Sequence, residues 1–361
     1  MMASPLRTMV ETTPTDYWND SCALDELRAA IERGGSGATS NPTIVGEVLK
    51  KEWGVWAPRL RAIRDERPSA SDVDVTWQLI EEMATGAAGL LEPTFRDHAG
   101  RKGRLSIQTN PTWWANTERM LEQGLRFAAL APNMQVKFPA TEAGLRAIEE
   151  ATARGVSINA TVSFTLAQAL AVGEAVERGL RRREDDGDDI SSMSPVCTLM
   201  VGRLDDWMRA VCERDDIVVD PAAPNWAGIA VIKRAVPIYH ERGYRTRLLA
   251  AAFRHHLHWS ELIGGDIVLT MTSQWQRRFE ASAVAVRPRF DEPVDARYIT
   301  ELCDRLPDFR RAYEPDGLTV QEFDTYGATV RTLRGFIGSY WDLVRTIDDS
   351  LLPNPDLRVQ G

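Results

Sequence analysis

Short apolar segments alternate along this chain with longer segments in which apolar residues recur every three to four positions. The short segments are typical of buried strands, and the longer ones are typical of amphipathic helices. Because short joints connect each strand to a helix, the pattern indicates βαβ units and a parallel sheet. Eight such units closing on themselves make a (β/α)8 TIM barrel, the fold class that we predict. The eight predicted strands lie near Tyr17, Ala38, Leu105, Val136, Ile158, Thr198, Leu249 and Leu269.

The two ends of the chain depart from this alternation. Residues 1–14 are rich in threonine, proline and small residues, so we expect a flexible tail there. The barrel is expected to occupy residues 15–290. Residues 291–361 have mainly helical patterning and no ninth strand, which predicts a C-terminal helical extension packed on the outside or bottom of the barrel. A mixed-charge run at 177–193 is predicted to be a solvated loop.

Composition and charge exclude several classes of function. The apolar content of 43% and the charged content of 26% are those of an ordinary soluble globular protein. A net charge of −9 leaves no basic surplus to neutralise phosphates, so we expect no nucleic-acid partner. No run of about 18 apolar residues could span a bilayer, and the first residues lack the apolar core of a signal peptide. We therefore expect a cytoplasmic protein without a membrane partner.

The cysteines give no sign of a disulfide or a zinc site. Cys22, Cys197, Cys212 and Cys303 are scattered along the chain without a CxxC pair. Such spacing is typical of reduced structural thiols.

One predicted strand, at 134–141, contains a lysine among apolar residues. Lys137 lies between Val136 and Phe138. An ionised lysine in an apolar environment loses hydration, and its pKa falls from about 10.4 towards roughly 7 to 8 in catalytic lysines. The neutral amine can attack a carbonyl and form a Schiff base. The alternative is a lysine whose stem packs against the strand while its ammonium group reaches solvent.

Polar residues also follow the other predicted strands. In a (β/α)8 barrel the C-terminal ends of all strands meet at one mouth, where active sites form. Schiff-base chemistry needs an amine, a proton carrier, polar groups for substrate hydroxyls and a means of holding the far end of the substrate. The residues at these strand ends are Asp20, Asn41, Gln108, Lys137, Asn159, Thr161, Arg203 and Arg254. Asp20 is the only carboxylate among them and is the candidate acid and base, while Arg203 and Arg254 are the candidate phosphate clamp.

The segments that contain these residues resemble those of transaldolases. The resemblance extends from about residue 16 to residue 279 and keeps the order and spacing of five motifs. It implies a class I aldolase-type barrel that moves a dihydroxyacetone unit from a ketose phosphate to an aldose phosphate through a Schiff base, without a metal or another cofactor. The matching segments are TSNPTIV (39–45), VKFPAT with EAGLRAIE (136–149), INATVSFTLAQA (158–169), VGRLDDW (201–207) and AAFR (251–254).

The same resemblance implies a role for each matching residue. Lys137 matches the Schiff-base lysine, and Asp20 matches the aspartate that relays protons. The residues that match those binding the dihydroxyacetone unit or positioning the catalytic water are Asn41, Asn159 and Thr161. The residues that match the two phosphate-binding arginines are Arg203 and Arg254.

The chain also departs from the transaldolase pattern. Gln108 stands where transaldolases usually have a glutamate, and a glutamine can orient a water molecule but cannot accept its proton. We therefore expect Gln108 and Thr161 to hold the water of the proton relay. The fructose-6-phosphate aldolase subfamily is similar in having this glutamine, but it uses a tyrosine after the fifth strand, where this chain has Phe164. Ala252 replaces the usual serine before the phosphate-binding arginine. An aldolase that releases the ketone, and a catalytically silent sugar-phosphate-binding barrel, therefore remain alternatives to the transferase.

Individual residues have simpler interpretations as well. Asp20 could cap the following helix, and Asn41 could be a turn residue before a proline. Arg203 could pair with Asp206, and Arg254 with Glu261.

Three histidines, His255, His256 and His258, invite a metal interpretation because residues three apart on a helix share a face. No acidic or histidine partner follows them at a typical spacing, so we expect no metal site. The expected ligand is a small sugar phosphate, and a homodimer is possible.

Overall fold

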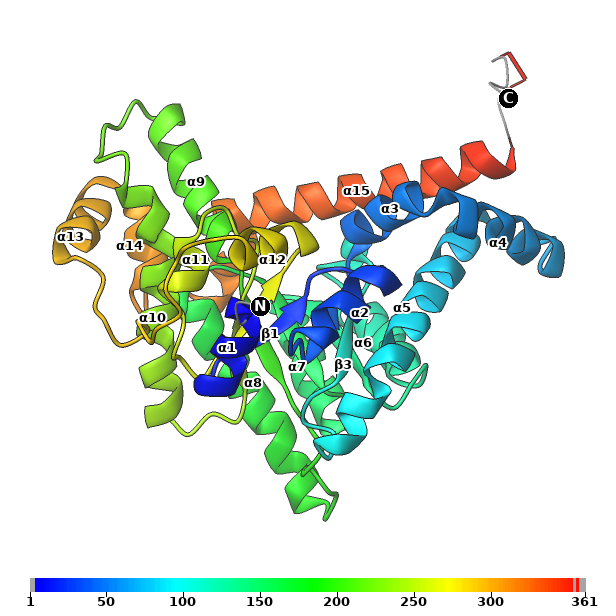
Figure 1. Cartoon of the computed structure of the whole chain (residues 1–361), viewed down its shortest axis with the longest axis horizontal. Helices are drawn as coiled ribbons and strands as arrows, with labels where there is room; N and C mark the ends of the chain where they lie inside the picture. Colours follow the sequence, from blue (N-terminus) through cyan, green and yellow to red (C-terminus); the bar gives the residue numbers. More distant parts are fainter. Residues whose placement is uncertain (1–3, 353–354, 357–361) are drawn as a thin grey trace.

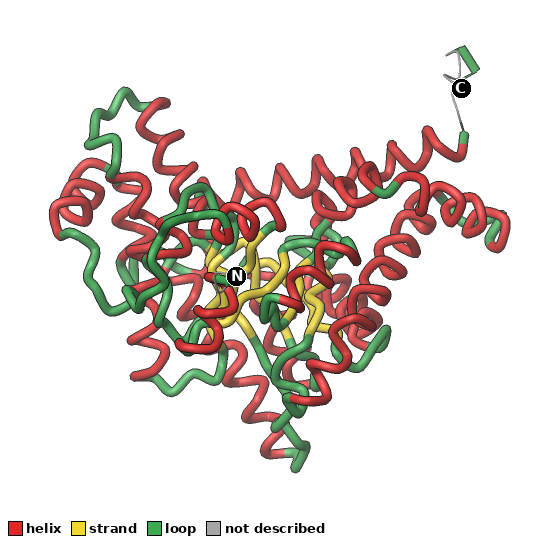
Figure 2. The backbone as a smooth tube through the Cα atoms, viewed as in Figure 1, coloured by secondary structure: helices red, strands yellow, loops and turns green. Residues whose placement is uncertain are grey.

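The computed structural model describes residues 4–352 and 355–356, and its centre is a closed barrel of eight parallel strands surrounded by helices (Figures 1 and 2). The strands follow one another in sequence order, and β1 pairs with β8 to close the ring. This arrangement confirms the predicted (β/α)8 TIM barrel. The strands are β1 (Asp16–Asn19), β2 (Gly37–Thr39), β3 (Arg104–Gln108), β4 (Met134–Pro139), β5 (Ile158–Ser163), β6 (Val196–Leu199), β7 (Arg247–Ala250) and β8 (Val268–Met271).

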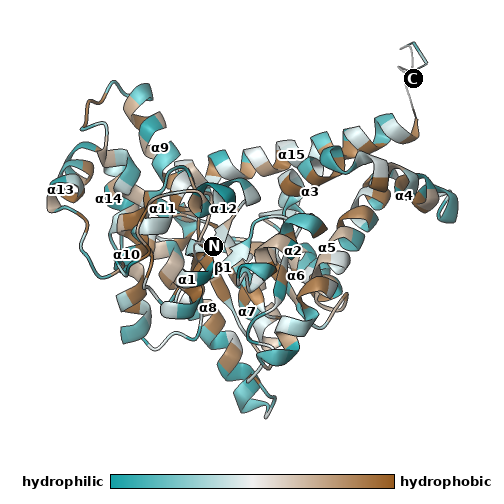
Figure 3. Ribbon diagram, in the orientation of Figure 1, coloured by the Kyte–Doolittle hydropathy of each residue, from teal (hydrophilic) through white to brown (hydrophobic). Residues whose placement is uncertain are grey.

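Amphipathic helices cover the outside of the barrel, with hydrophobic and hydrophilic positions alternating along each of them (Figure 3). Their apolar faces bury against the strands and against one another. Within the described residues, none of the helices combines the length and the apolar composition needed to cross a lipid bilayer. The helices between the first and last strands, and the one after β8, are α2 (Leu24–Glu32), α3 (Pro42–Lys51), α4 (Trp53–Glu66), α5 (Asp72–Asp97), η1 (Pro111–Trp113), α6 (Thr117–Ala128), α7 (Glu142–Ala153), α8 (Leu166–Asp185), α9 (Val201–Arg214), η2 (Ala223–Trp226), α10 (Ala227–Glu241), α11 (Leu257–Ser260) and α12 (Ser273–Glu280).

Side-chain caps start several helices within a few residues of the preceding strand. The Oδ1 atom of Asn41 accepts the backbone N–H of Ile44 at 3.0 Å and caps α3. Thr141 caps α7 and Thr165 caps α8 in the same way. Each cap satisfies a backbone donor that the helix itself leaves unpaired, and this fixes where the strand ends and the helix begins. The strand ends are thereby held at one level around the mouth of the barrel.

The described part of the N-terminal segment, residues 4–14, contains a helix, unlike the flexible tail expected for 1–14; residues 1–3 of that prediction lie outside the described residues. Residues Pro5–Thr12 form helix α1, in which Leu6 and Met9 are fully buried. The hydroxyl of Ser4 caps this helix and also donates to Glu280 Oε1 at 2.7 Å. A serine cap followed by a proline is a helix start signal, and the composition of the segment obscured it.

The mixed-charge run at 177–193 also differs from the expected loop, because its first half continues helix α8 as far as Asp185. Leu180 is buried on one face of this extension. On another face, Arg178 pairs with Glu149 at 2.7 Å and Arg182 pairs with Glu150 at 2.9 Å. These two arginines are thus partners of the neighbouring helix α7, while residues 186–193 lie outside helices and strands, as the loop prediction expects.

The C-terminal extension is helical, but its longest helix crosses the mouth of the barrel instead of the outside or bottom. The extension comprises α13 (Ala296–Arg305), α14 (Pro307–Tyr313), η3 (Val320–Thr325) and α15 (Gly327–Leu351). Helix α15 packs against α3, α5, α9 and the end of β5 before it runs beyond the barrel (Figure 1). Its residues Leu333, Phe336 and Tyr340 are buried. A 25-residue helix is long enough to span the whole mouth, so it forms one wall of the space above the strands.

Candidate active site

A cavity of about 380 Å³ opens at the C-terminal ends of the barrel strands. Its walls come from strand ends and from helices α3, α9, α12 and α15. The residues that were predicted from the sequence and that line this cavity are Asp20, Asn41, Lys137, Thr161, Arg203 and Arg254. The two other predicted residues, Gln108 and Asn159, are buried in the strands that flank Lys137.

Lys137 lies on β4, and its side chain reaches the cavity although the residue is only 5% exposed. Among the described residues, none gives its ammonium nitrogen a hydrogen bond or an ion pair. Burial lowers the pKa of Lys137 to about 8; the negative charge of Asp20 raises it and the positive charge of Arg203 lowers it. Near neutral pH roughly a tenth of this amine is therefore uncharged and nucleophilic.

Gln108 and Asn159 flank Lys137 in the sheet. The register places Gln108 of β3 opposite Lys137, and Lys137 opposite Asn159 of β5, so the three residues form one layer across these adjacent strands of the sheet. The Asn159 side chain donates to Ser106 Oγ at 3.1 Å and accepts from Thr198 Oγ1 at 2.7 Å. Its amide is thus held by barrel side chains beneath the cavity.

Two buried oxygens of this region have no hydrogen-bond partner among the described residues: Gln108 Oε1 and Thr161 Oγ1. A buried polar atom without a partner is uncommon in folded proteins and calls for a bound water or ligand. Both atoms come from residues near the lysine, Gln108 in the same layer and Thr161 two residues after Asn159 on β5. The position therefore suits a water molecule or a substrate hydroxyl.

Asp20 follows β1 and faces the same cavity. Its backbone N–H donates to Met271 O at 2.8 Å, and its carboxylate accepts a hydrogen bond from Thr39 Oγ1. The residue preceding helix α2 is Ala23, and that helix start has no side-chain cap. Asp20 is therefore not a helix cap, and its carboxylate is available for a ligand.

Asn41 fulfils both interpretations that its sequence context allowed. Its Oδ1 atom caps helix α3, while the residue also lines the cavity. The cap occupies only the carbonyl oxygen, so the amide N–H2 group remains available as a donor to a ligand.

The two arginines do not form the ion pairs that were the simpler alternatives to a phosphate clamp. The guanidinium of Arg203, at the start of α9, lies over the ring of Phe336 at 5.0 Å and makes no hydrogen bond or ion pair with any residue that the structure describes. Burial, and secondly the charge of Arg254, lower its pKa. Arg254 pairs with Asp206 through Nε at 2.8 Å. The alternative pairs of Arg203 with Asp206 and of Arg254 with Glu261 are therefore absent from the described residues.

Glu261 instead pairs with Arg289 at 3.1 Å and with Lys233 at 3.5 Å. The cavity consequently holds two neighbouring guanidinium groups, of which only one has a carboxylate partner. The other guanidinium, that of Arg203, is partly exposed and has no salt-bridge partner among the described residues, which favours binding of an anion.

Sequence reasoning missed several residues of the cavity. Thr39 lies two positions before Asn41, so strand periodicity could have found it, whereas Glu47 lies one turn after Thr43 on helix α3, a cavity residue that was not predicted. Burial, and secondly the charge of Asp20, raise the pKa of Glu47. No sequence pattern indicates that Phe336 lines the cavity, because it belongs to the C-terminal helix α15 and not to a strand end.

Behind Arg254, three ionisable side chains meet in a way that the sequence did not indicate. Asp205, His255 and His258 bring one ligand atom each within 4.8 Å of one another. The expectation that the histidines lack an acidic partner is therefore wrong: the partner comes from helix α9 and lies 53 residues before His258.

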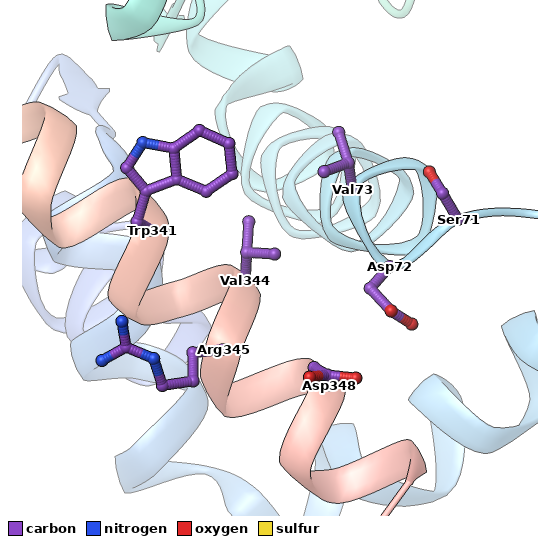
Figure 4. A pocket seen from close by; sticks show the side chains of 7 residues that line it. All are labelled: Ser71, Asp72, Val73, Trp341, Val344, Arg345 and Asp348. Carbon is purple, nitrogen blue, oxygen red and sulfur yellow. The ribbon is translucent and has the colours of Figure 1, made fainter.

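A second cavity, of about 430 Å³, lies between the start of α5 and the last turns of α15 (Figure 4). Trp341 and Val344 form its apolar side, and Asp72, Arg345 and Asp348 its charged side. None of its lining residues belongs to a strand end. The groups that Schiff-base chemistry needs are therefore found in the barrel cavity and not here.

Comparison with known proteins gives a consistent picture. A model of the transaldolase/fructose-6-phosphate aldolase family matches residues 17–304. The chain is 31% identical to a transaldolase of Thiobacillus denitrificans, with 65% of this chain and 67% of that protein aligned. It is 28% identical to a transaldolase of Parafrankia sp. over 94% of this chain and 99% of that protein. The match to a transaldolase of Thermobifida fusca, at 30% identity, covers 56% of each chain and thus just over half of that relative.

Proposed function

Because the chain belongs to the transaldolase/fructose-6-phosphate aldolase family, we propose that it transfers a dihydroxyacetone unit from a ketose phosphate to an aldose phosphate through a Schiff base on Lys137. The observation that carries this proposal is the position of Lys137: a buried amine without a partner among the described residues, in one cavity with Asp20 and Arg203. Such an amine is poised to attack a carbonyl, and the cavity supplies both a proton acceptor and an anion site.

The first step joins enzyme and donor. The neutral amine of Lys137 attacks the C2 carbonyl of the ketose phosphate, and the carbinolamine then loses water to form an iminium ion. The lowered pKa of Lys137, caused by burial, supports this step because it makes the free amine accessible near neutral pH. Asn41, whose amide hydrogens are uncommitted, is suited to hold a hydroxyl of the dihydroxyacetone unit.

The second step breaks the bond between C3 and C4 of the donor. The Asp20 carboxylate removes the proton of the C4 hydroxyl, the aldose phosphate leaves as an aldehyde, and the electron pair of the broken bond enters the iminium as an enamine. The enamine then attacks the acceptor aldehyde, and Asp20 returns its proton to the new hydroxyl. Gln108 and Thr161, which have unpartnered buried oxygens, are suited to hold the water that finally hydrolyses the iminium.

Arg203 and Arg254 hold the phosphate of donor and acceptor in turn. The guanidinium of Arg203 has no ion-pair partner in the described part of the chain. A bound phosphate would accept hydrogen bonds from its N–H groups and neutralise its charge. Arg254 is already paired with Asp206, which fixes its orientation beside Arg203.

Borohydride reduction tests the proposal directly. We expect incubation with fructose 6-phosphate and borohydride to add the mass of a reduced dihydroxyacetone adduct to one peptide, the one that contains Lys137. An acceptor aldose phosphate added before the borohydride should discharge the adduct. If several ketose phosphates leave the protein mass unchanged, the chain is a silent sugar-phosphate-binding barrel.

An aldolase that releases dihydroxyacetone is the second candidate function, and Gln108 favours it because transaldolases usually have a glutamate at that place. Incubation with donor alone separates the two candidates. Steady formation of free dihydroxyacetone supports the aldolase, whereas one equivalent of trapped adduct per protein, without free product, supports the transferase.

Replacing Gln108 with glutamate should raise the pH at which the adduct forms. A carboxylate in the same layer as Lys137 stabilises the ammonium form, so the apparent pKa of the amine should rise from about 8 by about one pH unit or more. The pH dependence of the trapping rate measures this. Gln108→Met is the matched control, because it keeps the side-chain length without a charge. A Gln108→Glu profile identical to that of the wild type would contradict the proximity of these two side chains.

Replacing Arg203 with methionine should raise KM for fructose 6-phosphate on the order of 100-fold, because the phosphate loses its only unneutralised cation. Methionine keeps an apolar stem against Phe336, so packing should survive. Trapping of free dihydroxyacetone, which has no phosphate, should be unchanged. Arg334→Met, at an exposed position of the same helix that carries Phe336, is the control. An equal loss with both ligands would refute the phosphate assignment.

A further inference from the structure

The side chains behind the phosphate-binding arginines form a buried network centred on Asp205. Asp205 is 0% exposed, and its Oδ2 atom lies 3.0 Å from His255 Nε2 and 2.8 Å from His258 Nε2. Its other oxygen, Oδ1, accepts the backbone N–H of Gly228 at 2.9 Å. Although burial alone would raise the pKa of Asp205, the hydrogen bonds from the two histidines hold it below its ordinary value. The carboxylate is therefore ionised and fully engaged.

The protonation state of His258 follows from its second ring nitrogen. Its Nδ1 atom accepts the backbone N–H of Arg254 at 3.0 Å. A nitrogen that accepts a hydrogen bond carries no proton, so the proton of the neutral ring is on Nε2 and is donated to Asp205. Burial lowers the pKa of His258, which keeps the ring in this neutral form.

This tautomer argues against a metal site. A metal bound by this cluster would need the lone pair of His258 Nε2, and that position carries the proton. A metal-ligating histidine usually donates its other N–H to an acceptor, whereas Nδ1 of His258 faces a donor. The cluster is therefore a closed hydrogen-bond network that ends on the backbone of Arg254.

The same network joins two segments that each carry an arginine. Helix α9 supplies Arg203, Asp205 and Asp206, and the loop after β7 supplies Arg254. Asp206 holds the Arg254 side chain through Nε, while Asp205 acts on the Arg254 backbone through His258. Asp205 and Asp206, two neighbouring carboxylates of helix α9, thus both hold the loop.

The loop itself needs such support. Ala252 has a backbone φ of +65°, a conformation that residues with a Cβ seldom adopt. Its carbonyl lies so close to α9 that a Cβ on Gly202 would come within 1.9 Å of the oxygen. Nη1 of Arg254 donates to the carbonyls of Ala252 and Phe253 at 3.0 and 3.1 Å. The loop is therefore strained, tightly packed against α9 and held from behind by His258.

We propose that Asp205 and His258 are positioning residues that fix Arg254 beside Arg203 and thereby set the affinity of the site for a phosphate group. This inference rests on the proposed function, in which both arginines bind the substrate phosphate. Asp205 and His258 touch neither substrate nor Lys137; they act through the backbone of Arg254.

Two substitutions of His258 separate its two hydrogen bonds. His258→Asn places an amide oxygen near the position of Nδ1 and keeps the acceptor for Arg254, but loses the donor to Asp205. His258→Gln places an amide nitrogen near the position of Nε2 and keeps that donor, but leaves the Arg254 N–H without an acceptor. We expect His258→Gln to raise KM for fructose 6-phosphate by about tenfold or more, and His258→Asn to raise it by clearly less. Asp205→Asn should also raise KM about tenfold, because the amide is uncharged and its single oxygen replaces the carboxylate that accepts hydrogen bonds from both histidines.

Sulfate binding gives a readout that does not depend on catalysis. The rise in Tm with added sulfate measures the anion affinity of each folded variant. We expect the sulfate affinity to be highest in the wild type, lower in His258→Asn and lowest in His258→Gln. The control His256→Asn, at an exposed neighbouring position, should behave like the wild type. Trapping of free dihydroxyacetone on Lys137 should be unchanged in all four proteins, as expected for residues that act on the phosphate alone.

The outcomes distinguish this inference from the proposed function. Sulfate affinities and KM values that are equal in wild type and His258→Gln overturn the positioning role, even if Lys137 forms its adduct. Absence of the adduct in the wild type overturns the proposed function, while the order of sulfate affinities still tests the network. Tight zinc binding that Asp205→Asn abolishes overturns the tautomer and the inference with it. If His258→Gln does not fold, the same comparison is made with Asp205→Asn.

Discussion

Replacing Lys137 with methionine is expected to lower kcat/KM on the order of 10⁴-fold or more while the protein stays folded. Without the amine no Schiff base can form, and the cavity offers no second lysine among its lining residues. Turnover assays and borohydride trapping should both lose their signal. Lys50→Met, at an exposed lysine on helix α3, is the matched control and should keep both.

The same substitution is expected to stabilise the protein. Folding takes the ammonium of Lys137 into an environment where its pKa is about 8 instead of 10.5, which corresponds to a cost of up to about 3 kcal/mol below pH 8. Because the unfolded chain binds the proton more tightly, wild-type stability should rise with pH between about 8 and 10.5. Methionine removes both the cost and the pH dependence. Denaturant unfolding at several pH values measures this.

Two results would contradict this account of Lys137. Residual turnover in Lys137→Met within about tenfold of the wild type would exclude a covalent role for the amine. A variant that is strongly destabilised would show that the lysine makes a stabilising contact, contrary to an amine without a partner.

Replacing Asp20 with asparagine is expected to lower kcat by about 10²- to 10⁴-fold, because general acid–base catalysis typically contributes that much. Asparagine is close in size and its oxygen can still accept the hydrogen bond from Thr39, so the geometry should be kept. It cannot remove the proton of the C4 hydroxyl, and cleavage of the carbon–carbon bond should stop.

The Asp20 variant should still react with free dihydroxyacetone, because forming that adduct breaks no carbon–carbon bond; the carbinolamine only loses water. Borohydride trapping with dihydroxyacetone, compared with trapping from fructose 6-phosphate, separates the two steps. Asp25→Asn, on the exposed face of α2 where Asp25 pairs with Arg28 at 2.9 Å, is the control. Equal turnover of Asp20→Asn and wild type would remove Asp20 from the mechanism.

Much of the cavity could be found from the sequence because a closed barrel converts strand order into proximity. Lys137, Asp20 and Arg203 are far apart along the chain, yet Asp20 and Arg203 follow strands and Lys137 lies in the second half of one, and all strand ends meet at one mouth. Periodicity also finds Thr39, which lies two positions before the predicted Asn41, whereas Glu47 lies one turn after Thr43, a cavity residue that was not predicted.

Other features had no local signal. The composition of the N-terminal segment is typical of a tail and concealed its helix, and the charges of the α8 extension concealed its helical structure. In both cases the burial of an apolar residue, Leu6 or Leu180, depends on neighbours that the local sequence does not contain. Phe336 reaches the cavity only because α15 crosses the mouth of the barrel.

The sequence by itself determined the fold and six of the polar residues that line the cavity, because strand and helix periodicity act over a few residues and the strand ends of a barrel meet at a single mouth. Only the tertiary structure decided which charges are paired. Arg254 takes Asp206 as its partner, Arg203 is left for an anion, and Asp205 joins His258 to the backbone of Arg254. Such pairings depend on distances of about 3 Å between groups many residues apart, and these distances exist only once the helices have packed against the barrel.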